Sequence, residues 1–212
     1  MKAWQHFVTI TNHRRLVRRG CFRIGLYWQG LTHDLSKYSP TEFLAGARYY
    51  QGTRSPNAAE REDKGYSEAW MHHKGRNRHH YEYWTDMSKA TQNYEAVPMP
   101  RKFVAEMVAD RIAACKVYEK EHYTPGSALA YLNRSREKNL MHPQTRKELE
   151  FLLTMLQDEG EKATLCFAVF YGGRSNPFKP RAIKAVGVKG AALRALVPLP
   201  RSKGTAGRGP SG

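Results

Sequence analysis

Residues 101–121 read RKFVAEMVADRIAACKVYEKE and form the clearest helical segment of the chain. Apolar residues recur in it at three- and four-residue spacings, as on the buried face of an α-helix. Asp110 falls on this same face, three residues after Met107 and four before Ala114. A buried carboxylate is costly unless a cation or hydrogen-bond donors satisfy it. The segment therefore predicts a core helix that carries a charged group in need of a partner. Its predicted buried stripe is Phe103, Met107, Ala114 and Val117.

A second helical stripe lies near the N-terminus, from about residue 12 to residue 28. Val17, Cys21, Ile24 and Trp28 follow the spacing of one helix face. His13 is four residues before Val17 and so lies on the same inward face. The segment therefore predicts a helix with a buried histidine.

The remaining segments also favour helices. Ser39-Pro40-Thr41-Glu42 has the features of a helix start, with Ser39 as the N-cap and Glu42 completing a capping box. Residues 50–63 are polar and predict a loop that leads into a helix at about 60–73, which Gly75 and Asn77 end. No strand alternation persists, so we expect an all-α bundle of six or seven helices. The other expected helices are a short one at 79–84, after which Pro98 and Pro100 mark a turn, and two more at about 127–138 and 143–158, the last with Leu149, Leu152, Leu153 and Leu156 facing inward.

Composition limits the class of protein. The chain has 212 residues, of which 41% are hydrophobic, enough for one domain with a buried core. The longest apolar run, near residues 165–171, is far shorter than the roughly 20 residues of a membrane-spanning helix. No signal-peptide segment follows Met1, and the three cysteines are far apart, which argues against a disulfide framework. We therefore expect a cytoplasmic protein with no membrane partner.

The positive charge is unevenly distributed. The chain carries a formal charge of +16, of which +9 falls in residues 172–212 and +7 in residues 1–171. Residues 172–212 have no acidic residue, eight glycines and five prolines. Such a composition predicts a disordered basic tail after a folded domain at residues 1–171. The tail is either a dispensable extension or a weak, nonspecific tether for nucleic acid.

Histidines and carboxylates form the candidate chemical site. His33 and Asp34 are adjacent at the predicted end of a helix, and four of the nine histidines fall within nine residues: His72, His73, His79 and His80. Imidazole and carboxylate together suit a divalent iron, manganese, zinc, cobalt or nickel ion. A solvated polar patch is the alternative for the histidine cluster taken alone. Its position between His33-Asp34 and Asp110 in the chain favours a metal site.

The order His13, His33-Asp34, histidine cluster, Asp110 resembles the HD superfamily of metal-dependent phosphohydrolases. More closely, the chain resembles an HD-like domain family of bacteria and phages that has no known function. This resemblance covers about residues 6–158 and rests on three stretches of sequence. They are residues 29–43 (QGLTHDLSKYSPTEF), His72-His73 with 77–84 (NRHHYEYW), and Met99-Pro100 with 106–110 (EMVAD).

The resemblance implies a fold and a ligand set. His13, His33, Asp34 and Asp110 would hold a first ion, and Asp34 would bridge to a second ion held by His73, His79 or His80. Asp34 and Lys37 would be the catalytic residues, with Lys37 stabilising charge on a phosphoryl group. The substrate would be a nucleotide or another small phosphoester. Glu106 is a candidate for orienting a ligand histidine, and Arg76 and Arg78 are candidates for phosphate contacts.

Other function classes remain open at this level. The Glu106–Asp110 spacing differs from the Glu-x-x-Asp of the all-α nucleotide pyrophosphatases, whose carboxylate-only sites would not explain nine histidines. Tyr81, Tyr83 and Trp84 are interpreted as packing rather than as a base-stacking pocket. A metal-binding sensor or scaffold without turnover, and a nucleic-acid-binding protein acting through its tail, are the alternatives to the hydrolase.

Overall fold

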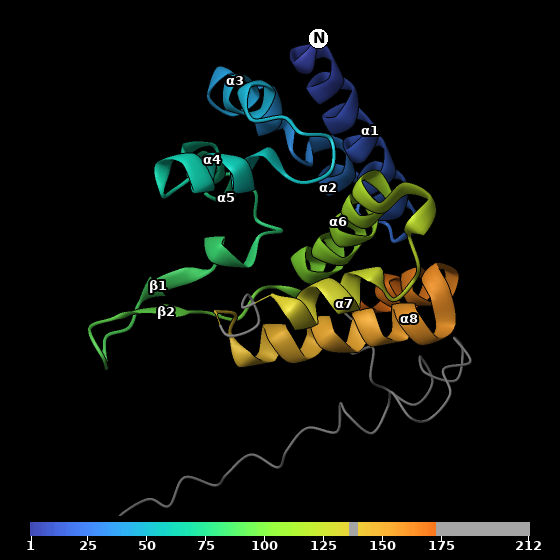
Figure 1. The fold of residues 1–212 in the computed structure, drawn as a ribbon. Coiled ribbons are helices and arrows are strands. Elements are labelled where there is room, and N and C mark those ends of the chain that lie inside the picture. The colour runs from blue at the N-terminus through green and yellow to red at the C-terminus, as the bar shows by residue number, and fades with distance from the viewer. Residues whose placement is uncertain (136–139, 173–212) are drawn as a thin grey trace, which may run out of the picture.

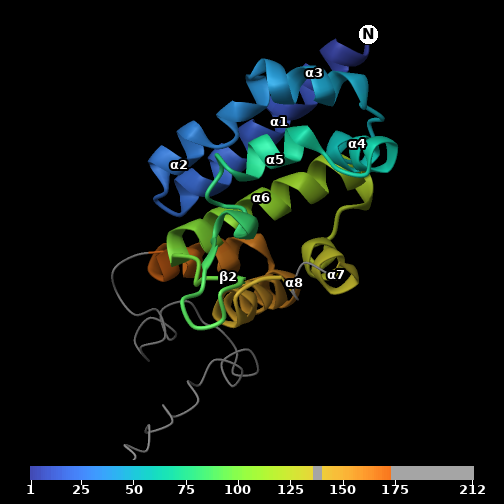
Figure 2. The same ribbon diagram turned by 90° about the vertical axis from the view of Figure 1, so that its left-hand side faces the viewer.

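α6 (Arg101–Glu119) is the central helix of this computed structural model, which describes residues 1–135 and 140–172. It packs against α1 (Lys2–Arg23) on one side and against α8 (Pro143–Gly172) on the other. Figures 1 and 2 show the N-terminal helices on one side of α6, with α7 and α8 on the opposite side. The all-α class is confirmed, with eight α-helices within the described residues. The remaining helices are α2 (Tyr27–Thr32), α3 (Pro40–Arg48), α4 (Pro56–Lys64), α5 (Glu68–Lys74) and α7 (Ser127–Arg134).

Short elements connect these helices. They are the 3-10 turns η1 (Leu35–Tyr38), η2 (Tyr81–Tyr83) and η3 (Lys120–His122), and the strands β1 (Thr85–Met87) and β2 (Tyr94–Ala96). The two strands form an antiparallel hairpin in which Thr85 pairs with Ala96 and Met87 with Tyr94. The hairpin lies away from the helices in Figure 1 and is the one sheet within the described residues.

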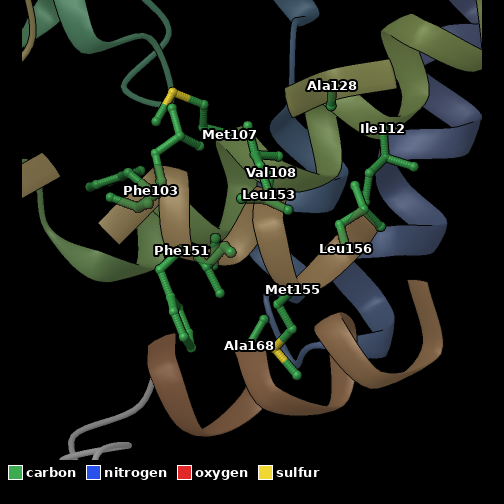
Figure 3. Packing of buried hydrophobic residues seen from close by; sticks show 14 of the residues in the cluster. Phe103, Met107, Val108, Ile112, Ala128, Phe151, Leu153, Met155, Leu156 and Ala168 are labelled. Atoms are coloured by element: carbon green, nitrogen blue, oxygen red, sulfur yellow. The ribbon is translucent and has the colours of Figure 1, made fainter. Parts of the chain in front are cut away.

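The apolar core lies between α6, α7 and α8. Leu149, Leu152, Leu153 and Leu156 are all fully buried, as the sequence predicts for the inward face of this helix. Figure 3 shows side chains of α6 and α8 interdigitating, with Ala128 of α7 beside them. Since fully burying one such side chain stabilises a fold by about 1.5–3 kcal/mol, this layer is the main apolar support of α6. The labelled residues of that contact are Phe103, Met107, Val108 and Ile112 from α6, and Phe151, Leu153, Met155 and Leu156 from α8.

Two predicted helices are each divided by a glycine. The helix expected at 12–28 is α1, which begins at Lys2, followed after Gly25 by α2. The helix expected at 60–73 is α4 followed after Gly65 by α5, so the predicted loop over 50–63 is also too long. Gly25 and Gly65 have φ of 75° and 82°, a left-handed conformation that ends a helix and that glycine adopts without a Cβ clash.

Two other predictions about the elements need correction. The short helix expected at 79–84 is only the turn η2, and the β1–β2 hairpin follows it, with residues 88–93 connecting the two strands. The helix expected at 143–158 extends as α8 to Gly172, with a sharp change of direction at Gly160, where φ is 79°. The Phe151 and Phe167 rings, with centroids 5.4 Å apart, pack the two halves of α8 against each other.

Two sequence expectations concern the tail and the membrane. Apart from Gly172, the predicted basic tail at 172–212 lies outside the described residues. Residues 136–138 of the helix expected at 127–138 also lie outside them. Among the described residues, no helix has the length and apolar character needed to span a bilayer.

Candidate metal centre

Asp34 is at the centre of the site and has an unusual backbone conformation. It lies two residues after the end of α2 and has φ 53° and ψ 26°, in the left-handed region that aspartate tolerates better than most residues. Arg14 of α1 donates hydrogen bonds to the carbonyls of His33 (2.7 Å) and Leu31 (3.1 Å), which would otherwise be unsatisfied at the end of α2. These contacts hold Asp34, which is fully buried, between α1, α5 and α6.

One oxygen of Asp34 faces a first set of ligand atoms. Asp34 Oδ2 is 3.5 Å from His13 Nε2 and 3.4 Å from His33 Nε2. Asp110 Oδ1 completes the set, at 3.0 Å from His13 Nε2 and 3.4 Å from His33 Nε2. The structure therefore brings His13, His33, Asp34 and Asp110 together from α1, the end of α2 and α6.

The other oxygen of Asp34 faces a second set. Asp34 Oδ1 is 3.3 Å from His73 Nε2 and 3.4 Å from His79 Nε2, and His80 Nε2 is 2.9 Å from His73 Nε2. His73 lies on α5, whereas His79 and His80 lie in the turn after it, as the predicted break at Gly75 requires. Asp34, His73, His79 and His80 thus form a second cluster that shares Asp34 with the first.

The spacing of these atoms fits a metal ion at the centre of each set. Ligand atoms about 2.1 Å from a common ion are separated by about 3.0–3.4 Å at octahedral or tetrahedral angles. The N···O separations of the two sets, 3.0–3.5 Å, match this range. The ring nitrogens His13 Nε2, His33 Nε2 and His79 Nε2 and both Asp34 oxygens are buried without a hydrogen bond of good geometry. Because unsatisfied buried polar groups are costly, these atoms form a donor set that could hold a divalent ion.

Two buried carboxylates orient the histidines from behind. Glu106 Oε1 is 3.0 Å from His33 Nδ1 and 3.3 Å from His79 Nδ1. Glu42 Oε2 is 2.7 Å from His73 Nδ1, and its other oxygen is 2.6 Å from His72 Nδ1. With Nδ1 as the donor, His33, His79 and His73 each present the lone pair of Nε2 to the centre, as a metal ligand must.

Glu42 thus corrects one sequence prediction. Ser39 does cap α3, since its Oγ accepts a hydrogen bond from the Glu42 N–H (3.4 Å). The Glu42 carboxylate, expected to return to Ser39 as the second half of a capping box, contacts His72 and His73 instead. Two imidazole donors give it stronger, charge-assisted bonds than one backbone N–H.

The pKa values of the centre are shifted in different directions by burial and by neighbouring charges. Burial lowers the pKa of His33, but the Asp34, Asp110 and Glu106 carboxylates together outweigh burial and raise that pKa well above its usual value. Burial raises the pKa of Asp34, yet His33 and Lys37 reverse this and hold it well below its usual value. Burial and then the neighbours His79 and His73 lower the pKa of His80 well below its usual value. Nearby carboxylates thus favour the protonated form of His33, whereas burial and neighbouring histidines favour the neutral form of His80, and metal binding releases protons from such a site.

The centre opens onto two cavities. A cavity of about 170 Å³ is lined by His13, His73, His80 and Asp110 together with Lys37. Lys37 Nζ is 2.6 Å from Asp34 Oδ2. A larger cavity of about 500 Å³ shares Trp70, His80, Asp110 and Tyr118 with the first. Its volume is that of a typical small-molecule site.

Two predicted phosphate contacts lie elsewhere. Arg76 is exposed and donates to the His72 carbonyl (3.3 Å), and the exposed Arg78 guanidinium lies 5.5 Å from the centroid of the Tyr83 ring. Neither residue lines the two cavities. Arg111 lines the larger cavity instead, one residue after Asp110, and sequence reasoning did not single it out. The sequence signal that could have identified Arg111 is its position directly after Asp110, a predicted metal ligand.

The described fold and site define an all-α protein with two histidine–carboxylate sets that can hold metal ions. Residues 2–155 match the Family of unknown function (DUF5662), and the chain belongs to that family. This agrees with the expected likeness to a domain family without known function, whereas no HD-domain family matches. No curated protein and no solved structure matches the chain.

Proposed function

We propose that the protein is a metal-dependent phosphohydrolase of the HD type that acts on a nucleotide or another small phosphoester. The observation that carries this proposal is the position of Asp34. Each of its carboxylate oxygens faces a separate set of histidines, and both sets line a cavity that also contains Lys37. This arrangement favours one or two divalent ions of iron, manganese, zinc, cobalt or nickel.

In the proposed reaction, a water oxygen forms a bond to phosphorus while the P–O bond to the ester oxygen breaks, and a proton goes to the departing alcohol. A divalent ion supplies Lewis acidity that lowers the pKa of water and polarises a phosphoryl oxygen. Asp34 would hold such ions through its two oxygens. Lys37 would place a positive charge beside the phosphoryl oxygens, where charge develops in the transition state.

The experiment measures metal content and phosphate release on the full chain. Protein reconstituted with each of the five metals is analysed by elemental mass spectrometry and then screened against a panel of phosphoesters. We expect one or two equivalents of metal, with phosphate release that depends on that metal. The His33→Ala, Asp34→Ala double variant should lose both. His122→Ala is the matched control, because this histidine is on the surface turn η3 and 85% exposed.

The possible results separate the function classes. Metal loss together with loss of phosphate release in the double variant supports the hydrolase. Bound metal without hydrolysis of any ester would favour a metal-binding sensor or scaffold. No bound metal in the wild type after reconstitution would refute the proposal.

A further inference from the structure

His6 is a buried histidine that neither ligand set uses. It lies on α1 seven residues before His13, which is about two helical turns, and therefore on the same inward face. It is 6% exposed and lines the smaller cavity together with Lys37, His13 and Asp110. His6 thus borders the same space as the proposed metal ligands from a position further along α1.

The His6 imidazole has no polar partner in the described part of the chain. No hydrogen bond or ion pair joins it to another residue of 1–135 or 140–172. Its neighbours are the rings of Phe43 and Tyr50, with centroids 5.5 and 5.9 Å away. Burial, and then the charge of Lys37, lowers the pKa of His6 to about 4. The ring is therefore neutral at pH 7 and has one N–H to donate.

The fold makes room for this ring at a specific place. A Cβ on Gly46 of α3 would lie 2.2 Å from His6 Nε2 and 2.5 Å from His6 Cε1, so any residue larger than glycine would push the imidazole away. Glycine is a poor helix former, and Gly46 is inside α3. Gly46 therefore costs α3 some helical stability, but its missing side chain leaves room for the His6 ring at the cavity wall.

We infer that His6 is a substrate-binding residue that donates a hydrogen bond to a phosphoryl oxygen, with Lys37 supplying the charge on the same subsite. The inference rests on the proposed function, because it assigns the phosphoryl group of that substrate to this cavity. The cavity carboxylates are already engaged. Glu42 bonds His72 and His73, and Asp110 faces His13 and His33. Lys37 uses one of its three ammonium N–H groups on Asp34 Oδ2, so its other N–H groups and the neutral His6 donor on the cavity wall suit an anion.

The experiment measures binding of inorganic phosphate to the reconstituted full chain by isothermal titration calorimetry. A hydrogen bond to a charged group corresponds to about tenfold in affinity or more, so we expect His6→Ala to weaken phosphate binding by about that factor. Gly46→Ala should cause a similar loss by displacing His6. Overpacking against the buried His6 ring offsets the helical preference of alanine, so phosphate binding by Gly46→Ala is measured at a temperature at which this variant is fully folded. His6→Gln retains an N–H donor and should stay within about threefold of the wild type.

The double variant His6→Ala, Gly46→Ala tests whether the two residues act as one unit. We expect it to bind phosphate no more weakly than either single variant, since effects on a shared interaction do not add. His122→Ala, on the surface, should bind as the wild type does. Wild-type affinity in either single variant, additive losses in the double variant, or no phosphate binding by the wild type would overturn the inference. Phosphate binding that depends on His6 without turnover of any ester would refute the hydrolase alone.

Discussion

Glu106 connects the two ligand sets, and its replacement tests their arrangement. Its Oε1 lies 3.0 Å from Nδ1 of His33 in the first set and 3.3 Å from Nδ1 of His79 in the second. Glu106→Gln removes the negative charge that fixes the tautomer of both rings while nearly conserving the volume of the side chain. We therefore expect this single change to weaken both metal sites.

The expected size follows from the contacts. Loss of a carboxylate behind a ligand histidine costs about 10- to 100-fold in metal affinity, or about 1.4–2.7 kcal/mol per ion. The 3.0 Å contact to His33 is within the usual range of an N–H···O bond, whereas the 3.3 Å contact to His79 is beyond it. The loss should therefore be larger for the set that contains His33.

The assay is a chelator-competition titration of the reconstituted protein. His13→Ala and His80→Ala assign the two binding steps, because each histidine belongs to one set only. Glu148→Gln is the control, since Glu148 is a buried carboxylate on α8 that pairs with Arg101 away from the centre. Unchanged affinity in Glu106→Gln, or a greater loss at the set that contains His80, would refute the reasoning.

Three further predictions concern charge, pH and packing. Lys37→Gln should retain the metal, because Lys37 is an ion-pair partner of Asp34 and not a ligand, but it should reduce phosphate release by about 100-fold. Unchanged turnover with normal metal content would contradict the proposed role of Lys37. The pKa of His6 is lowered by burial from 6.5 to about 4, so its contribution to stability is present above pH 6.5 and is lost as pH falls toward 4. Urea unfolding should therefore show a steeper loss of stability over that interval in the wild type than in His6→Gln, and equal slopes would count against a buried neutral imidazole. Leu153→Ala removes a fully buried side chain of α8 and should lower the free energy of unfolding by about 2–5 kcal/mol. The metal-to-protein ratio of the folded variant should equal that of the wild type. A loss of less than about 1 kcal/mol in chemical denaturation would argue against the core shown in Figure 3.

Helix boundaries were predictable where a local signal exists. Ser39-Pro40 marked the start of α3 and Pro100 marked the start of α6, because caps and prolines act on their immediate neighbours. The breaks at Gly25 and Gly65 were missed, although glycine was the available signal in both cases. The β1–β2 hairpin was missed because its strands of three residues are too short to show an alternating pattern.

The sequence by itself determined the all-α class and the inward positions of His13 and Asp110, because helical periodicity and the order of residues are local properties. Trp28, expected on the same face as His13, is 74% exposed because α1 ends before it. The pairing of side chains was decided by the tertiary structure alone. The crossing of α1, α3, α5 and α6 turns one Asp34 oxygen toward each ligand set, directs Glu42 to His72 and His73, and seats His6 against Gly46. Such contacts join residues 21 to 40 positions apart, and their distances depend on how the helices cross, which no spacing along one chain segment encodes.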